Sequence, residues 1–163
     1  MSKKLTLHGL QLLVFAALLA VDQYTKWLVL AAERRGAAMP FWSLGGVLDI
    51  IVTRNHGAAF GMLQGGGIFF LIIAIIAAAV IGFILGKGYV KNPWGVWGMI
   101  LIAAGALGNA VDRILHGYVV DMVRLLFINF AIFNAADVFI SAGAGMMFIY
   151  LFFYYEKERG KKT

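Results

Sequence analysis

The residues best placed to do chemistry are aspartates in apolar surroundings. Asp137 stands at the head of the run AADVFISAGAGMMFIYLFFYY, and Asp22, Asp112 and Asp121 also lie within or beside apolar segments. A charged side chain at the centre of a membrane helix costs about 2.5 to 3.5 kcal/mol, so these acids need compensation. Two carboxyl groups held close together cannot both ionise, so one keeps a proton while the other acts as a base. Such a pair can activate water to hydrolyse a peptide bond.

Other hydrolytic chemistries find no support in the sequence. The chain has no cysteine, which excludes a thiol nucleophile and a thiolate metal site. No serine lies in a GxSxG context, and Ser141 has no Lys or His at helical spacing. The three histidines are scattered without a metal-binding spacing such as HExxH, so we expect no metal and no other cofactor. A carboxylate pair therefore remains the candidate chemistry.

The composition is that of a membrane protein. Of the 163 residues, 62% are hydrophobic and 13% are charged, and the mean hydropathy is +0.86. An ordinary soluble domain has roughly 25% charged residues. The net charge of +6 comes from basic residues that lie mostly beside apolar runs. This placement fits membrane topology rather than binding to nucleic acid.

Four segments are apolar over the length of about 20 residues that a transmembrane helix needs. We expect a single integral membrane domain with spans near 5–32, 67–86, 94–115 and 134–155. Eight of the fourteen basic residues fall on one side of these spans, which the positive-inside rule makes cytoplasmic, together with both termini. These eight are Lys3, Lys4, Lys87, Lys91, Lys157, Arg159, Lys161 and Lys162.

The two longer joins face the opposite side. The join 33–66 contains VLDIIVT between GG and RNHG, which predicts short strands that form a small extracytoplasmic platform. The join 116–133 is apolar but carries Asp121 and Arg124, and its uncharged remainder is too short to span a bilayer. We therefore expect this segment to lie along the outer interface as a helix or loop. The predicted fold class is an all-α membrane protein with four transmembrane helices and this outer β platform.

Depth brings the aspartates to one level. Asp22, Asp112 and Asp137 each lie seventeen or eighteen residues from the cytoplasmic end of their span. At 1.5 Å per helical residue, this is roughly 25 to 27 Å into a hydrocarbon layer of about 30 Å. Asp121 can fold back to the same level after a turn at Gly117. The site is therefore expected near the extracytoplasmic face.

Structural roles remain open for several of these acids. Asp22 has Lys26 at helical i, i+4 spacing, which equally predicts an ion pair that only stabilises the bundle. Asp112 lies beside Arg113 and three residues after Asn109, and it could serve as scaffold. Arg124 follows Asp121 by three residues, so a structural pair there is a further alternative.

Five short motifs in order resemble those of bacterial lipoprotein signal peptidase, also called signal peptidase II. They read DQxTK at 22–26, RNxGAAxG at 54–61, GALGNxxDR at 105–113, VVD at 119–121 and FNxAD at 133–137. The resemblance covers almost the whole chain. Met122 stands where this family usually has Phe.

The resemblance implies a membrane aspartyl endopeptidase of the bacterial cytoplasmic membrane, inhibited by the cyclic peptide globomycin. Its substrates are prolipoproteins, whose signal peptide is removed next to a diacylglyceryl-modified cysteine, and membrane lipids surround it. By motif position, Asp121 and Asp137 are the catalytic dyad, and we expect the chain to work as a monomer. The implied supporting residues are Asp22, Lys26, Asn55, Gly57, Asn109, Asp112, Arg113, Asn134 and Ala136.

A small proton-coupled transporter is the alternative function, because buried acids in membrane helices often form ion pathways. A proton relay should continue across the bilayer. The cytoplasmic halves of the second and fourth spans, such as GMMFIYLFFYY, contain no ionisable group except tyrosine. The pattern therefore favours the peptidase.

Overall fold

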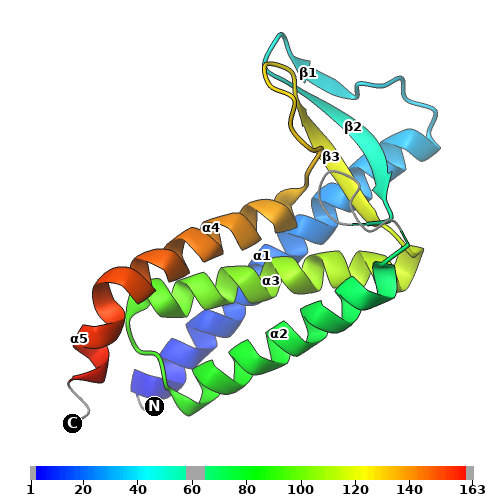
Figure 1. The fold of residues 1–163 in the computed structure, drawn as a ribbon. Coiled ribbons are helices and arrows are strands. Elements are labelled where there is room, and N and C mark those ends of the chain that lie inside the picture. The colour runs from blue at the N-terminus through cyan, green and yellow to red at the C-terminus, as the bar shows by residue number, and fades with distance from the viewer. Residues whose placement is uncertain (1–2, 58–64, 161–163) are drawn as a thin grey trace.

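Four long helices form the body of the protein (Figure 1). The structure is a computed structural model, and it describes residues 3–57 and 65–160. The helices are α1 (Lys3–Arg34), α2 (Gly67–Lys87), α3 (Pro93–His116) and α4 (Ala135–Ile149), which a π-helical turn (Tyr150–Tyr154) and α5 (Tyr155–Arg159) continue. Within the described residues, four helical segments are long and apolar enough to cross a membrane. The predicted four-helix fold class is confirmed.

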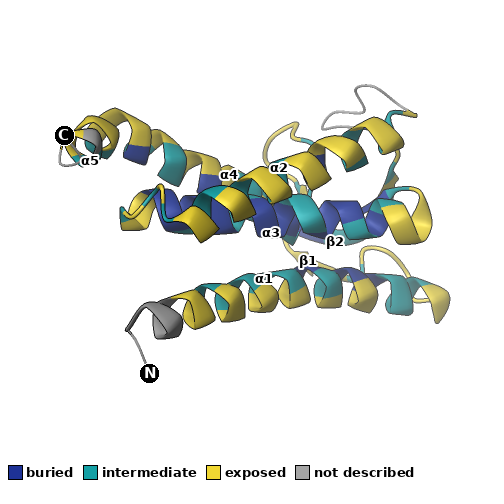
Figure 2. Ribbon diagram, turned by 90° about the horizontal axis from the view of Figure 1, so that it is seen from below, coloured by how far each residue is buried: buried dark blue, intermediate teal, exposed yellow. Residues whose placement is uncertain are grey.

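Helix α3 is the centre of the bundle. It packs against α1, α2 and α4, and it is the most buried of the four helices (Figure 2). Glycines bring α3 and α4 into close contact, since a Cβ atom at Gly143 would lie 2.6 Å from the carbonyl oxygen of Gly98. Small residues at such contacts let membrane helices approach closely. Helix α2 is exposed and apolar along most of its length, as expected for a surface that faces lipid.

A three-stranded antiparallel sheet stands at one end of the bundle (Figure 1). Its strands are β1 (Trp42–Leu44), β2 (Leu48–Asn55) and β3 (Val119–Leu125), in that order. The prediction of a helix or loop for the join 116–133 is wrong for residues 119–125, because these pair with β2 as a strand. The valine-rich stretch VVDMVRL satisfies its backbone groups with a partner strand far away in the chain, for example Asn55 opposite Val119.

The sheet is fastened to the bundle by a small apolar core. Val52 of β2 and Val120 and Met122 of β3 pack together with Val29 of α1. Successive side chains of a strand point to opposite faces, so Asp121, between Val120 and Met122, points away from this core. It is nevertheless buried, with 3% exposure. The strand therefore presents Asp121 toward the ends of α3 and α4.

The start of α4 is fixed by a reciprocal cap. The side-chain oxygen of Asn134 accepts a hydrogen bond from the backbone N–H of Asp137, and a carboxylate oxygen of Asp137 accepts one from the backbone N–H of Asn134. Such a capping box satisfies two N–H groups that a helix start otherwise leaves unpaired. It also fixes the side chain of Asp137 at the outer end of the helix.

Candidate active site

Asp121 and Asp137 line the same pocket. One comes from the middle of β3 and the other from the first turn of α4, and the pocket has a volume of about 680 Å³. Asn134 connects them: its Nδ2 donates to Asp121 Oδ1 at 2.7 Å, while its backbone N–H donates to Asp137 Oδ2 at 3.1 Å. Because one residue contacts both carboxylates, the two acids are held side by side at the pocket wall.

Neutral amides satisfy the remaining oxygens of both acids. Asn55 Nδ2 donates to Asp121 Oδ2 at 2.9 Å, and Asn109 Nδ2 donates to Asp137 Oδ1 at 2.9 Å. Among the described residues, no ion pair forms with either carboxylate. Burial raises the pKa of Asp121 to about 6; the hydrogen bond from Asn55 opposes this shift, and the negative charge of Asp137 adds to it. The pair is thus suited to hold a proton and a base together.

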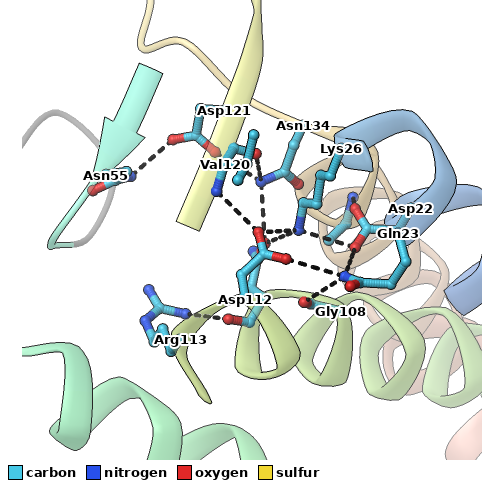
Figure 3. Close-up of polar contacts among 12 residues, drawn as sticks. Asp22, Gln23, Lys26, Asn55, Gly108, Asp112, Arg113, Val120, Asp121 and Asn134 are labelled. Atoms are coloured by element: carbon cyan, nitrogen blue, oxygen red, sulfur yellow. Dashed lines mark hydrogen bonds and ion pairs between the residues drawn. The ribbon is translucent and has the colours of Figure 1, made fainter. Parts of the chain in front are cut away.

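A second group of buried charges lies close to the pair, and Figure 3 shows it together with Asp121 and Asn134. Lys26 Nζ contacts Asp22 Oδ2 at 2.9 Å and Asp112 Oδ2 at 3.0 Å, and all three side chains are at most 3% exposed. The Asp22–Lys26 pair expected from the i, i+4 spacing is therefore present. Asp112 pairs with Lys26 rather than with its neighbour Arg113. Adjacent residues on a helix do not face each other, whereas α1 and α3 do.

These buried carboxylates also hold backbone groups of the site. Asp22 Oδ1 accepts the N–H of Ala136 at 2.9 Å, and Asp112 Oδ2 accepts the N–H of Val120 at 2.9 Å. A Cβ atom at Gly108 would lie 2.5 Å from Asp22 Oδ2, so only glycine leaves room for this arrangement. The group therefore ties α1, α3, β3 and α4 together.

Gln23 belongs to this group, although the sequence did not single it out as a site residue. Its Nε2 lies 3.0 Å from Asp22 Oδ2, 3.0 Å from the carbonyl oxygen of Gly108 and 3.2 Å from Asp112 Oδ1. The only signal in the sequence is its position next to Asp22, inside the motif DQxTK. A polar residue beside a buried acid in an apolar span could have been proposed on that ground.

Arg113 lies at the pocket rim, half-buried. It donates to the carbonyl oxygens of Asn109 and Gly57 at 3.2 Å each, and its guanidinium lies 5.3 Å from the ring centroid of Phe70. Asn55 accepts the N–H of Gly57 at 2.9 Å, which orders the chain at the end of β2. Arg113 therefore connects α3 to the chain at Gly57; residues 58–61 of the second motif lie outside the described residues.

All eleven residues singled out from the sequence lie in this region, but they fall into two sets. Six line the pocket: Asn55, Gly57, Asn109, Arg113, Asp121 and Asp137. The other five do not line the pocket: Asp22, Lys26, Asp112, Asn134 and Ala136. Of these, Lys26 and Asn134 donate hydrogen bonds to members of the first set. The alternative pairing of Asp121 with Arg124 is wrong, since Arg124 pairs with Asp49 of β2. Within the described residues, no cluster of His, Cys, Asp or Glu could hold a metal ion.

The fold and the site together define a multi-pass membrane protein with two neighbouring carboxylates at one pocket. Known proteins with similar sequences support this class of protein. The family model described as signal peptidase (SPase) II matches residues 14–153. The lipoprotein signal peptidase of Enterococcus faecalis is 41% identical over 139 residues, which are 85% of each chain. That of Geobacillus thermodenitrificans is 37% identical over 152 residues, 92% of this chain and 94% of its own.

A solved structure is also similar. A bacterial membrane enzyme matches with a TM-score of 0.77 and 31% identity, covering 95% of this chain and 92% of its own. A second one matches with a TM-score of 0.76 and 32% identity over 90% and 94%. The chain belongs to the signal peptidase II family.

Proposed function

We propose that this protein is an aspartic endopeptidase of the bacterial cytoplasmic membrane that cleaves signal peptides from prolipoproteins, on the N-terminal side of a diacylglyceryl-modified cysteine. The observation that carries the proposal is the pair Asp121 and Asp137, which faces one pocket. Asp121 is buried and Asp137 is half-buried, and the hydrogen bonds that their carboxylates accept come from neutral N–H groups. Membership of the signal peptidase II family supports the reaction and the substrate class.

In the proposed reaction, the two carboxyl groups share one proton. Asp121, whose pKa is raised to about 6, holds this proton, and Asp137 accepts one from a water molecule as the water oxygen attacks the scissile carbonyl. Asp121 protonates the carbonyl oxygen, which gives a tetrahedral diol. Asp137 then delivers its proton to the amide nitrogen, the C–N bond breaks, and a diol hydroxyl returns a proton to Asp121. The products are a carboxylic acid and an amine.

The shape of the pocket supports a substrate that lies in the membrane. From the two carboxylates the lining continues along apolar residues of α2 and α4, including Ile73, Ala77 and Ala142. A lipid-anchored precursor can therefore enter sideways, and membrane lipids are expected at this opening. The eleven site residues meet within one chain, which supports a monomer as the active form.

The distribution of basic residues supports one orientation of the protein in the membrane. The start of α1, helix α5 and the connection between α2 and α3 lie at the end of the bundle opposite the sheet (Figure 1). Lys87 and Lys91 of that connection support its cytoplasmic placement. The sheet and the carboxylate pair then lie at the extracytoplasmic side, where a secreted precursor presents its cleavage site.

The transporter alternative is not supported. The chain belongs to a peptidase family, and the polar network of the site lies at one end of the bundle. Ionisable groups near the other end, such as Glu158 with Tyr150, lie at the cytoplasmic ends of the helices and are separated from the site by the apolar middle of α4. No continuous relay across the bilayer is present among the described residues.

Incubation of the purified protein with a diacylglyceryl-modified precursor and with its unlipidated twin tests the proposal. We expect peptide release from the lipidated form alone, and none from D121N or D137N. Each variant is first checked for folding by its elution and its thermal transition in detergent. Cleavage by either folded variant at the wild-type rate, or no cleavage of the lipidated form by the wild type, would contradict the proposal.

A further inference from the structure

We propose that Lys26 is the positioning residue that sets the separation of Asp121 and Asp137. It acts through three side chains, none of which is a member of the pair. The inference rests on the proposed function, because it concerns how that site keeps its geometry. It assigns to one buried ammonium group the alignment of two acids that come from different elements, β3 and α4.

The first connection runs to α4. Lys26 Nζ lies 2.9 Å from Asp22 Oδ2, and the other oxygen of Asp22 accepts the backbone N–H of Ala136 at 2.9 Å. Ala136 is the residue immediately before Asp137. Holding the Ala136 N–H therefore fixes the backbone from which the Asp137 side chain extends.

The second connection runs to β3 and repeats this pattern. Lys26 Nζ lies 3.0 Å from Asp112 Oδ2, which also accepts the backbone N–H of Val120 at 2.9 Å. Val120 is the residue immediately before Asp121. One ammonium group thus binds two carboxylates (Figure 3). Each of these carboxylates anchors the backbone directly before one member of the pair.

The third connection orients an amide. Asn109 Oδ1 accepts hydrogen bonds from Lys26 Nζ at 2.9 Å and from Asn134 Nδ2 at 3.1 Å. With its oxygen occupied by two donors, Asn109 must turn its NH₂ group the other way, where it donates to Asp137 Oδ1 at 2.9 Å. Without the ammonium group, one of the two contacts that hold this orientation is lost.

The three N–H donors of a lysine side chain suit this positioning role, and all three are used by neighbouring residues. An ammonium group has three N–H donors, and Asp22, Asp112 and Asn109 provide three acceptors. Lys26 is 2% exposed and does not line the pocket. No donor is left for a substrate, so Lys26 acts only through its neighbours.

The test measures kcat and KM of K26M with the lipidated precursor. A displacement of about 1 Å of a reacting group can cost about 100-fold in rate, so we expect kcat to fall about 100-fold. KM should change less than about threefold, because the pocket wall is untouched. D22N and D112N each weaken one connection and should lose about tenfold in kcat.

R124M is the matched control, because it too removes a cation that is paired with a buried carboxylate, Asp49. Arg124 lies in β3, three residues after Asp121, but its ion pair does not involve Asp121 or Asp137. We expect its kcat to equal that of the wild type. Rates are expressed per folded molecule, so a role in stability alone would leave kcat of K26M unchanged.

If K26M does not fold, D22N/K26M/D112N is measured in its place, because it removes the three buried charges together and leaves none unpaired. A loss of kcat with KM preserved supports the positioning role. A kcat within about threefold of the wild type, or a loss confined to KM, overturns it. If the wild type itself does not cleave the precursor, the proposed function fails, independently of Lys26.

Discussion

Two groups of aspartates lie next to each other in this protein, and they differ in what compensates their charge. Asp22 and Asp112 share the ammonium group of Lys26. Within the part of the chain that the structure describes, Asp121 and Asp137 accept hydrogen bonds from Asn134 and two further amides and form no ion pair. Burial alone does not distinguish the groups, since Asp121 is 3% exposed, close to the 0% of Asp22 and the 1% of Asp112, whereas Asp137 is half-buried. Access to the pocket does distinguish the groups, because Asp121 and Asp137 line it and Asp22 and Asp112 do not.

The difference teaches how one residue type serves two purposes in a low-dielectric setting. A carboxylate paired with a cation can hold backbone N–H groups through charge-assisted hydrogen bonds, as Asp22 and Asp112 do. A carboxylate surrounded by neutral donors keeps a proton affinity that can be used at physiological pH. In the proposed reaction, the first group positions and the second group reacts.

The largest expected effect comes from removing the shared cation. K26M leaves Asp22 and Asp112 buried without a counter-charge, and breaking a buried ion pair in this way destabilises by about 3 to 5 kcal/mol. Equilibrium unfolding in detergent measures the change in free energy. D121N should cost much less, because it removes a buried charge instead of leaving one unpaired. Equal losses of unfolding free energy in K26M and D121N would show that the two groups of aspartates do not differ in how their charge is compensated.

The next effect comes from crowding the first group. In G108A the new Cβ atom would lie 2.5 Å from Asp22 Oδ2 and 3.3 Å from the Cβ atom of Ala136. Overpacking of this kind costs about 1 to 3 kcal/mol, and we expect a lower thermal midpoint together with a lower kcat. G82A on α2, where nothing lies within 4 Å, is the control and should change neither. A G108A protein as stable and active as G82A would argue against tight packing at Asp22.

The pH dependence of cleavage extends the comparison to Asp49 and Asp121, one paired with a cation and one surrounded by neutral donors in the same sheet. A hydrogen bond from Arg124 lowers the pKa of Asp49, whereas burial raises the pKa of Asp121 to about 6. A carboxyl group with a raised pKa keeps its proton to a higher pH. The form with one shared proton is therefore depleted as pH rises above about 6, and kcat/KM should fall about tenfold per pH unit there.

Rates measured between about pH 4.5 and 8.5 test this dependence. The limb near pH 6 belongs to the pair, so R124M, which alters only the surroundings of Asp49, should leave it in place. A kcat/KM that stays constant from pH 6 to 8 would show that Asp121 does not hold the proton in the free protein.

The smallest effect is expected at the exposed pair of Arg54 and Glu33. Their side chains are 46% and 28% exposed, and their closest atoms lie 2.7 Å apart. Exposed ion pairs contribute about 0 to 1 kcal/mol, so E33Q should change the free energy of unfolding by less than about 1 kcal/mol. A loss comparable to that of K26M would remove the distinction between buried and exposed charge on which the comparison depends.

The sequence predicted the elements whose signals are local. Apolar runs of membrane-spanning length indicated the four helices, and counting residues along three of them placed Asp22, Asp112 and Asp137 at one level. The Asp22–Lys26 pair followed from its i, i+4 spacing. These features depend on the geometry of a single helix, which the spacing of residues fixes.

Features that depend on distant partners could not be predicted in the same way. Strand β3 forms because its backbone pairs with β2, far away in the chain, whereas its composition alone resembles an interfacial segment. Likewise, Asp112 pairs with Lys26 of α1 and Arg124 pairs with Asp49, although each has a nearer candidate in the sequence. Such choices are made when helices and strands pack together, and one sequence does not reveal them.

The most direct test compares single-turnover cleavage of the lipidated precursor by D22N, D112N, D121N and D137N, each measured per folded molecule. We predict two classes of variant. D22N and D112N cleave slowly but measurably, because they disturb only alignment, whereas D121N and D137N do not cleave, because each lacks a group that moves a proton. Cleavage by D121N or D137N at the rate of D22N would contradict the division between positioning and reacting carboxylates.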